Sequence, residues 1–176
     1  RVMTIIIIEE ILMANGLAVL MMGNLLLCRR KNRESLHTED KIYDVIALVN
    51  ILGALSETVA FLIDGKSFTG SRQINYAANS LCFIGTVSMS LLWCLYVELR
   101  IYRNYKRIFS KIAFLIFPWL VEVIMILCNL FRPGIVFRIS GANVYQRAGG
   151  SLACYISVIM YFGYSIYLVY HSRKQG

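Results

Sequence analysis

Charged residues are scarce in this chain. Only 16% of its 176 residues are Asp, Glu, Lys or Arg, whereas 58% are hydrophobic. Soluble domains average about 25% charged and about 45–50% apolar residues. Apolar stretches of this extent cannot all be buried in one small water-soluble core. The composition therefore excludes an ordinary soluble domain and predicts an integral membrane protein.

Patterns typical of catalysis and metal binding are also lacking. The two histidines, His37 and His171, have no metal-ligand spacing. No nucleophile–base constellation, phosphate loop or kinase signature is visible. The five cysteines form no CxxC pair: Cys28, Cys82, Cys94, Cys128 and Cys154. We expect free thiols, although Cys128 and Cys154 could meet. The sequence predicts no enzyme activity, cofactor or metal site in this chain.

Five apolar segments are long enough to cross a bilayer, which takes about 20 mainly apolar residues. They are Val2–Cys28, Ile42–Ile63, Ile74–Leu99, Ile112–Phe131 and Ser151–Tyr170. The first segment lacks a small-residue cleavage site and is expected to remain as a helix. The sequence predicts an all-α membrane protein, a single domain built as a five-helix transmembrane bundle.

The basic residues are distributed unevenly between the two predicted sides. Twelve of the 18 Lys and Arg residues fall in the loops after the first and third segments and in the tail. Cytoplasmic loops are enriched in Lys and Arg, so we expect the amino terminus outside and the carboxyl terminus in the cytoplasm. The net charge of +8 does not predict nucleic-acid binding, because these residues form short tracts between apolar runs.

The two outer loops differ in character. Residues 64–73 are rich in Gly and Ser and are interpreted as a plain connector. Residues 132–150 alternate through Ile135–Ile139, turn at Ser140-Gly141-Ala142-Asn143, and alternate again over Val144–Arg147. This pattern favours a small extracellular β-hairpin, with a disordered loop as the alternative.

Polar residues inside the apolar segments predict an outward-facing ligand cavity, because polar groups are costly in a bilayer. Asn50, Glu57 and Asp64 are spaced by seven and share one stripe of the second helix. The predicted ligand-binding residues are Glu9, Glu57, Asn75, Asn79, Glu122 and Asn129, with Arg138, Tyr145 and Arg147 from the hairpin above them. The alternative is that these residues only join helices, at about 0.6 kcal/mol per hydrogen bond.

Several stretches together resemble a known family. They are Leu62-Ile63-Asp64-Gly65-Lys66, Ile74-Asn75-Tyr76-Ala77-Ala78-Asn79, Leu92-Trp93-Cys94-Leu95-Tyr96-Val97, Tyr102-Arg103-Asn104-Tyr105-Lys106-Arg107 and Asn143-Val144-Tyr145-Gln146-Arg147. In order and spacing the chain resembles the amino-terminal membrane sensor region of GGDEF diguanylate cyclases from Firmicutes such as clostridia. It departs from the family at Ala148-Gly149, where the family has Gly-Pro.

The resemblance implies a receptor in the bacterial cytoplasmic membrane, acting as a homodimer. It would detect an external or membrane-borne small molecule and control cyclic di-GMP synthesis, with further helices and an output domain after Gly176. The alternatives are a substrate-binding component of a small-molecule transporter and an assembly subunit without a ligand. The acidic residues Glu9, Glu10, Glu57 and Glu122 favour a cationic ligand, but the outer arginines could neutralise them or hold an anion.

Overall fold

The computed structural model describes residues 2–31, 38–103 and 105–174, so Arg1, Arg33 and His37 lie outside this description. Its elements, in order, are the helices α1 (Val2–Lys31), α2 (Thr38–Ile63), α3 (Ser71–Tyr102) and α4 (Tyr105–Phe131), the strands β1 (Phe137–Ile139) and β2 (Tyr145–Arg147), and the helix α5 (Ser151–Arg173). All five helices are long and apolar enough to cross a membrane. The predicted five-helix architecture is confirmed.

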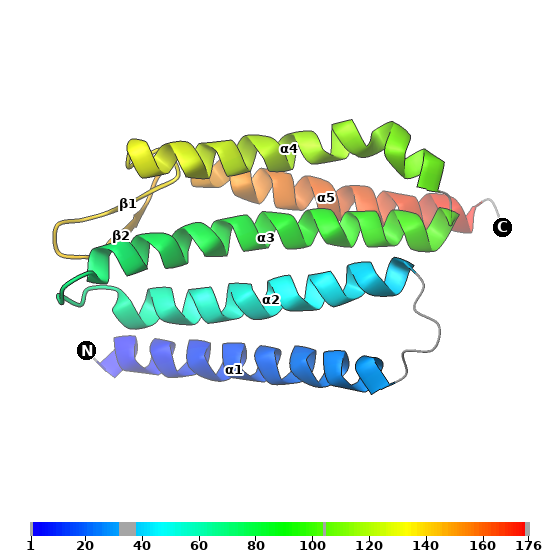
Figure 1. Ribbon diagram of the computed structural model, residues 1–176. Helices are drawn as coiled ribbons and strands as arrows, with labels where there is room; N and C mark the ends of the chain where they lie inside the picture. The colour runs from blue at the N-terminus through cyan, green and yellow to red at the C-terminus, as the bar shows by residue number, and fades with distance from the viewer. Residues whose placement is uncertain (1, 32–37, 104, 175–176) are drawn as a thin grey trace.

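The helices lie side by side and roughly antiparallel (Figure 1). The helix α3 is central, because it packs against α2, α4 and α5, whereas α1 packs against α2 at the edge of the bundle. The strands and the α2–α3 loop lie at one end, which we call the hairpin end. The carboxyl terminus lies at the other end, which we call the basic end because its segments carry most of the Lys and Arg residues.

Helix boundaries were predicted better at the hairpin end than at the basic end. At the hairpin end α2 ends at Ile63, α4 ends at Phe131 and α5 begins at Ser151, as predicted, whereas α3 begins at Ser71 and not at the predicted Ile74. At the basic end the helices extend three to seven residues beyond the predicted limits. Lys and Arg can continue a helix past its apolar run, because their stems cover apolar surface while their charged heads reach water. Gly and Pro stop the helices at the other end.

Small residues allow α2 and α3 to approach closely. A Cβ atom added at Gly85 would lie 3.8 Å from the Cα atom of Gly53, and Ala47 and Ala54 of α2 are buried. Close backbone approach through small residues is the usual way in which helices associate in membranes. Gly53, Ala54 and Gly85 of this contact also line the cavity described below.

The two strands form an antiparallel hairpin, which confirms the predicted hairpin. Its register pairs Phe137 with Arg147 and Ile139 with Tyr145. The Phe137 side chain is fully buried, and its ring centroid lies 4.8 Å from that of Tyr76 and 5.8 Å from that of Phe83. Because aromatic packing of this kind adds to the gain from area burial, Phe137 anchors the hairpin to α3.

Candidate ligand-binding cavity

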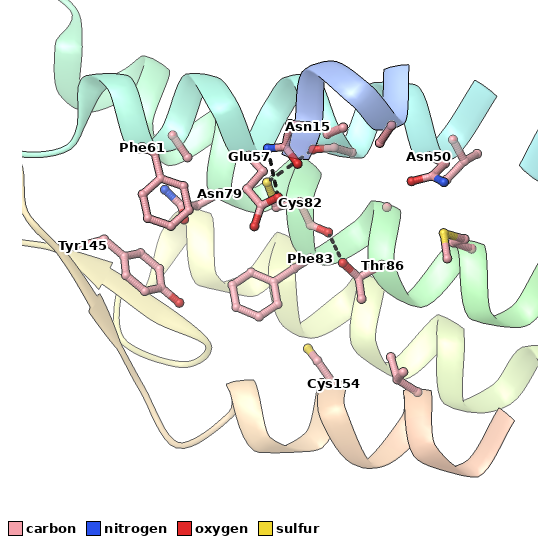
Figure 2. Close-up of a pocket in the computed structure, with 18 of the residues that line it drawn as sticks. Asn15, Asn50, Glu57, Phe61, Asn79, Cys82, Phe83, Thr86, Tyr145 and Cys154 are labelled. Carbon is pink, nitrogen blue, oxygen red and sulfur yellow. Dashed lines mark hydrogen bonds between the residues drawn. The ribbon is translucent and has the colours of Figure 1, made fainter. Parts of the chain in front are cut away.

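A cavity of about 400 Å³ lies between α1, α2, α3, α5 and the strand β2 (Figure 2). Its polar lining consists of Asn15, Asn50, Glu57, Asp64, Asn79, Cys82, Thr86, Tyr145, Arg147 and Cys154. Its aromatic lining consists of Phe61, Phe83, Tyr145 and Tyr155. The predicted α2 stripe of Asn50, Glu57 and Asp64 therefore faces one common space. The volume falls within the range of about 300–1,000 Å³ that is usual for small-molecule sites.

The Glu57 carboxylate projects into this cavity from α2 (Figure 2). The side-chain amide of Asn15 in α1 donates hydrogen bonds to Glu57 Oε2 and to Thr58 Oγ1, both at 3.1 Å. These bonds connect the peripheral helix α1 to α2. No ion pair to Glu57 is found among the described side chains. The carboxylate is thus accessible from the cavity and has only an amide donor.

The strand β2 supplies two further lining residues, Tyr145 and Arg147. The Arg147 guanidinium lies 5.2 Å from the ring centroid of Tyr155 in α5, a cation–π contact. Burial raises the pKa of Tyr145 above its ordinary value, and the hydrogen bond with Arg147 only partly offsets this effect. The Tyr145 phenol is therefore neutral at physiological pH, and β2 joins the hairpin to α5 across the cavity.

The hairpin is fastened to the α2–α3 loop through Asn143, a residue the sequence analysis placed only in the turn. Asn143 has a left-handed backbone (φ 58°), and its amide donates to the carbonyls of Ile63 at 3.0 Å and Lys66 at 2.8 Å. In return the Gly65 N–H donates to the Asn143 carbonyl at 2.8 Å. The α2–α3 loop therefore holds the hairpin in place by hydrogen bonds. Its interpretation as a plain connector was wrong.

Asp64 and Asn75 complete this attachment, which we call the hairpin latch (Asp64, Gly65, Asn75 and Asn143). The Tyr145 N–H donates to Asp64 Oδ1 at 2.7 Å. The fully buried Asn75 amide donates to Asp64 Oδ1 and to both oxygens of Asn143, at 3.1–3.3 Å. Asn79 lies one turn further along α3, where its amide donates to Asn75 Oδ1 at 2.7 Å. Asn79 lines the cavity and Asn75 does not, so this bond links the cavity wall to the latch.

Glu122 lies outside the described cavity lining, between α4 and α5. It is 2% exposed and accepts a hydrogen bond from the Cys154 thiol at 2.8 Å and another from the Ser157 hydroxyl at 3.0 Å. Cys154 itself lines the cavity, so its thiol links Glu122 to the site. Cys154 and Cys128 are both free thiols rather than a disulfide.

Three more residues predicted to bind ligand lie elsewhere. Asn129 is fully buried, and its Oδ1 accepts hydrogen bonds at 2.9–3.2 Å from three successive N–H groups, those of residues 134–136. Its amide and carbonyl both bond the Tyr76 hydroxyl. Arg138 donates to Gln146 across the exposed side of the hairpin at 2.9 Å. Glu9 is exposed on α1.

The structure therefore brings four of the nine predicted residues into one cavity: Glu57, Asn79, Tyr145 and Arg147. Asn75 and Asn129 fix the hairpin and its loop, which fits the alternative of interhelical joining. Glu122 joins α4 to α5, while Glu9 and Arg138 are surface residues. The sequence could not show which of the nine residues line the cavity and which join helices. These helices are apolar on most sides, so the sequence does not reveal which face points inward.

Glu98 of α3, a buried carboxylate at the basic end, was not predicted from the sequence as a functional residue. It is 1% exposed and forms ion pairs with Arg107 at 3.0 Å and Lys111 at 3.5 Å, both in α4. The Tyr164 hydroxyl of α5 donates to it at 2.9 Å and accepts from Lys111 at 3.0 Å. We call these four residues the Glu98 cluster. A carboxylate inside the apolar run Leu95–Leu99 was the signal that could have found it.

Five long apolar helices in one bundle define the class of this chain as a multi-pass helical membrane protein. No three His, Cys, Asp or Glu side chains cluster as metal ligands in the part of the chain that the structure describes. No protein-family model, curated protein or solved structure matches the chain.

Proposed function

We propose that the chain is a membrane-embedded sensory module whose cavity receives a small molecule and whose helix α5 carries the response to the basic end. The observation that supports this most strongly is the position of α5. The same helix lines the cavity with Cys154 and Tyr155 and reaches the Glu98 cluster with Tyr164. A ligand can shift an equilibrium only through contacts that differ between two states, and α5 has residues in contact with both the cavity and the Glu98 cluster.

Between these ends α5 contacts an interruption in α4. Pro118 lies inside α4, and a proline removes one backbone donor from a helix. The Tyr161 hydroxyl donates to the Leu115 carbonyl at 2.6 Å and accepts the Trp119 N–H at 3.1 Å. In a regular helix these two backbone groups bond each other directly. A shift of α5 would therefore alter α4 as well, and both helices join at the Glu98 cluster.

In this proposal the hairpin end faces outward and the basic end faces the cytoplasm, following the distribution of Lys and Arg. The output is cyclic di-GMP synthesis, as the resemblance to diguanylate cyclase sensor regions implies, and the module acts as a homodimer in the bacterial cytoplasmic membrane. The cavity thus recognises the ligand, and α5 transmits the response.

A transporter component is the second candidate. Transporter sites are typically built where paired helices are broken at the substrate. Here the proline inside a described helix is Pro118 of α4, and α4 supplies none of the described cavity-lining residues. The site is lined instead by the helices α1, α2, α3 and α5, which contain no proline, and by the strand β2, and this supports a receptor.

A reporter fusion tests the proposal. The chain is joined after Gly176 to a diguanylate cyclase domain, and cyclic di-GMP is measured across a panel of candidate ligands. The proposal predicts that a ligand which binds the chain changes the output, and that Glu57→Gln removes this change. Binding that leaves cyclic di-GMP constant, together with ligand accumulation in proteoliposomes, would instead establish the transporter.

A further inference from the structure

The charge state of the cavity indicates which ligands it can hold. Glu57 lies within the apolar span of α2 and is exposed, with one amide hydrogen bond, from Asn15, and no described ion pair. A charged side chain in a membrane normally pairs with an opposite charge or with several donors. An ionised Glu57 therefore has no opposite charge beside it among the described residues, and a cation inside the cavity would supply one.

The other charged lining residues do not supply a positive charge to Glu57. Arg147 is held by Tyr145 and by the Tyr155 ring, and it forms no described ion pair with Glu57. Asp64 Oδ1 is engaged by the Tyr145 N–H and by Asn75. With two carboxylates and one guanidinium, the described lining carries a net negative charge. This sign disfavours an anionic ligand and favours a monovalent cation.

The rest of the lining fits an organic cation rather than a metal ion. Phe61, Phe83, Tyr145 and Tyr155 contribute aromatic side chains to the lining, and ammonium groups are attracted to aromatic rings through the ring quadrupole. Val49, Met89 and Val158 provide apolar surface. A metal ion would need several oxygen or nitrogen ligands converging on one point, and no such cluster exists among the described residues.

We propose that the cavity binds a lipophilic organic ammonium ion, with its nitrogen at the Glu57 carboxylate and its apolar body against the aromatic lining. This inference rests on the proposed function, in that the occupant of the cavity is the sensed ligand. The same chemistry could reach the site as a dissolved amine or as an amphiphile from the bilayer. An amine in the cavity would contact α2 through Glu57 and α5 through Tyr155, and so would join the two helices.

Direct binding tests the inference without any signalling readout. The full chain in phosphatidylcholine nanodiscs at pH 7 is titrated calorimetrically with 4-phenylbutylamine, a dissolved amine, and with dodecylamine, a membrane amphiphile. The matched neutral probes are 4-phenylbutanol and dodecanol, and the matched anions are 4-phenylbutyrate and dodecanoate. Empty nanodiscs correct for partitioning into lipid. The variants are Glu57→Gln, which keeps an acceptor for Asn15, and Glu10→Gln, a control at an exposed position of α1.

We expect at least one amine to bind ~10-fold or more tightly than its alcohol, because its ammonium group can pair with the Glu57 carboxylate and the alcohol cannot. Glu57→Gln should reduce the affinity of that amine to the affinity of the alcohol, and Glu10→Gln should leave it unchanged. Equal affinities for amine and alcohol, stronger binding of the anion, absence of binding, or an amine affinity that Glu57→Gln does not alter would each overturn the inference. Glu57-dependent amine binding without any change in cyclic di-GMP would retain the inference and reject the proposed function.

Discussion

Tyr161 occupies a position where a proline interrupts the backbone bonding of α4. Its hydroxyl bonds both the Leu115 carbonyl and the Trp119 N–H, and its side chain is buried. In a bilayer no water replaces the hydroxyl when it is removed, so these two groups must then bond each other or remain unsatisfied. The backbone bonding of α4 beside Pro118 therefore includes a side chain from another helix.

The variant Tyr161→Phe tests this dependence. Each unsatisfied buried polar group costs about 1–3 kcal/mol, so we expect the free energy of unfolding to fall by about 2 kcal/mol in a denaturation titration with dodecyl sulfate in mixed micelles. Tyr167→Phe is the control, because Tyr167 is 57% exposed on α5. Equal effects of the two variants would contradict the assigned role of Tyr161.

Glu98 is the second residue whose surroundings imply a measurable role. We expect Glu98→Gln to lower the free energy of unfolding by about 1–2 kcal/mol. The loss of a buried partner would cost more, but Arg107 and Lys111 are 37% and 38% exposed and can turn toward water. The measurement is the same denaturation titration.

A double-mutant cycle separates charge pairing from packing at this site. Lys111→Met should be less destabilising in the Glu98→Gln background than in the unchanged protein, because the partner of Lys111 is already neutral. Additive effects would show that the Glu98–Lys111 ion pair contributes nothing to stability.

At the scale of elements, the entry into α5 depends on a close backbone approach. A Cβ atom at Gly150 would lie 2.3 Å from the carbonyl oxygen of Ile135, whereas a Cβ atom at Gly149 would meet nothing within 4 Å. The Gly150 N–H also donates to that carbonyl at 2.9 Å. The hairpin and the first turn of α5 are thus joined where only glycine fits.

The pair Gly150→Ala and Gly149→Ala tests this junction with a matched change in chemistry. We expect Gly150→Ala to destabilise the protein by about 1–3 kcal/mol, the usual cost of overpacking, and to raise hydrogen exchange at the Gly65 and Tyr145 amides, which donate to Asn143 and Asp64 of the latch. Gly149→Ala should change neither quantity. A larger destabilisation by Gly149→Ala than by Gly150→Ala would contradict the proposed close contact at Gly150.

Much of this element-level architecture could be predicted from the sequence, for identifiable reasons. The hairpin end was predicted well because Asp64-Gly65, Pro133-Gly134 and Gly149-Gly150 stop apolar runs sharply. Alternation and turn residues indicated the hairpin. The latch could not be predicted, since it joins Asn143 to a loop about 80 residues earlier, and spacing along one chain does not reveal such contacts.

The site was predicted only in part for a similar reason. The seven-residue spacing correctly placed Asn50 and Glu57 on one face of α2, and Asp64, in the turn directly after α2, lines the same cavity. It could not show that Glu122 points between α4 and α5, or that Asn129 is fully used by three N–H groups of the following loop. Which polar groups remain available to a ligand is decided by tertiary partners, and these appear only in the structure.

At the scale of the whole molecule, the account requires opposite ends of the bundle to face opposite sides of the membrane. Gly141→Cys places a thiol on the exposed hairpin turn, and Lys174→Cys places one at the basic end. With the native cysteines replaced by serine, we expect a membrane-impermeant maleimide to label position 141 in intact cells and position 174 only after permeabilisation. Labelling of position 174 in intact cells would invert the proposed orientation.

The central claim is that occupation of the cavity is communicated through α5 to the basic end. The most direct measurement is hydrogen exchange by mass spectrometry on the chain in nanodiscs, with and without the amine that binds at saturation. The account predicts altered exchange around the cavity and also at residues 106–111 and 168–174, with both changes absent in Glu57→Gln. Altered exchange confined to the cavity, with the basic end unchanged, would contradict it.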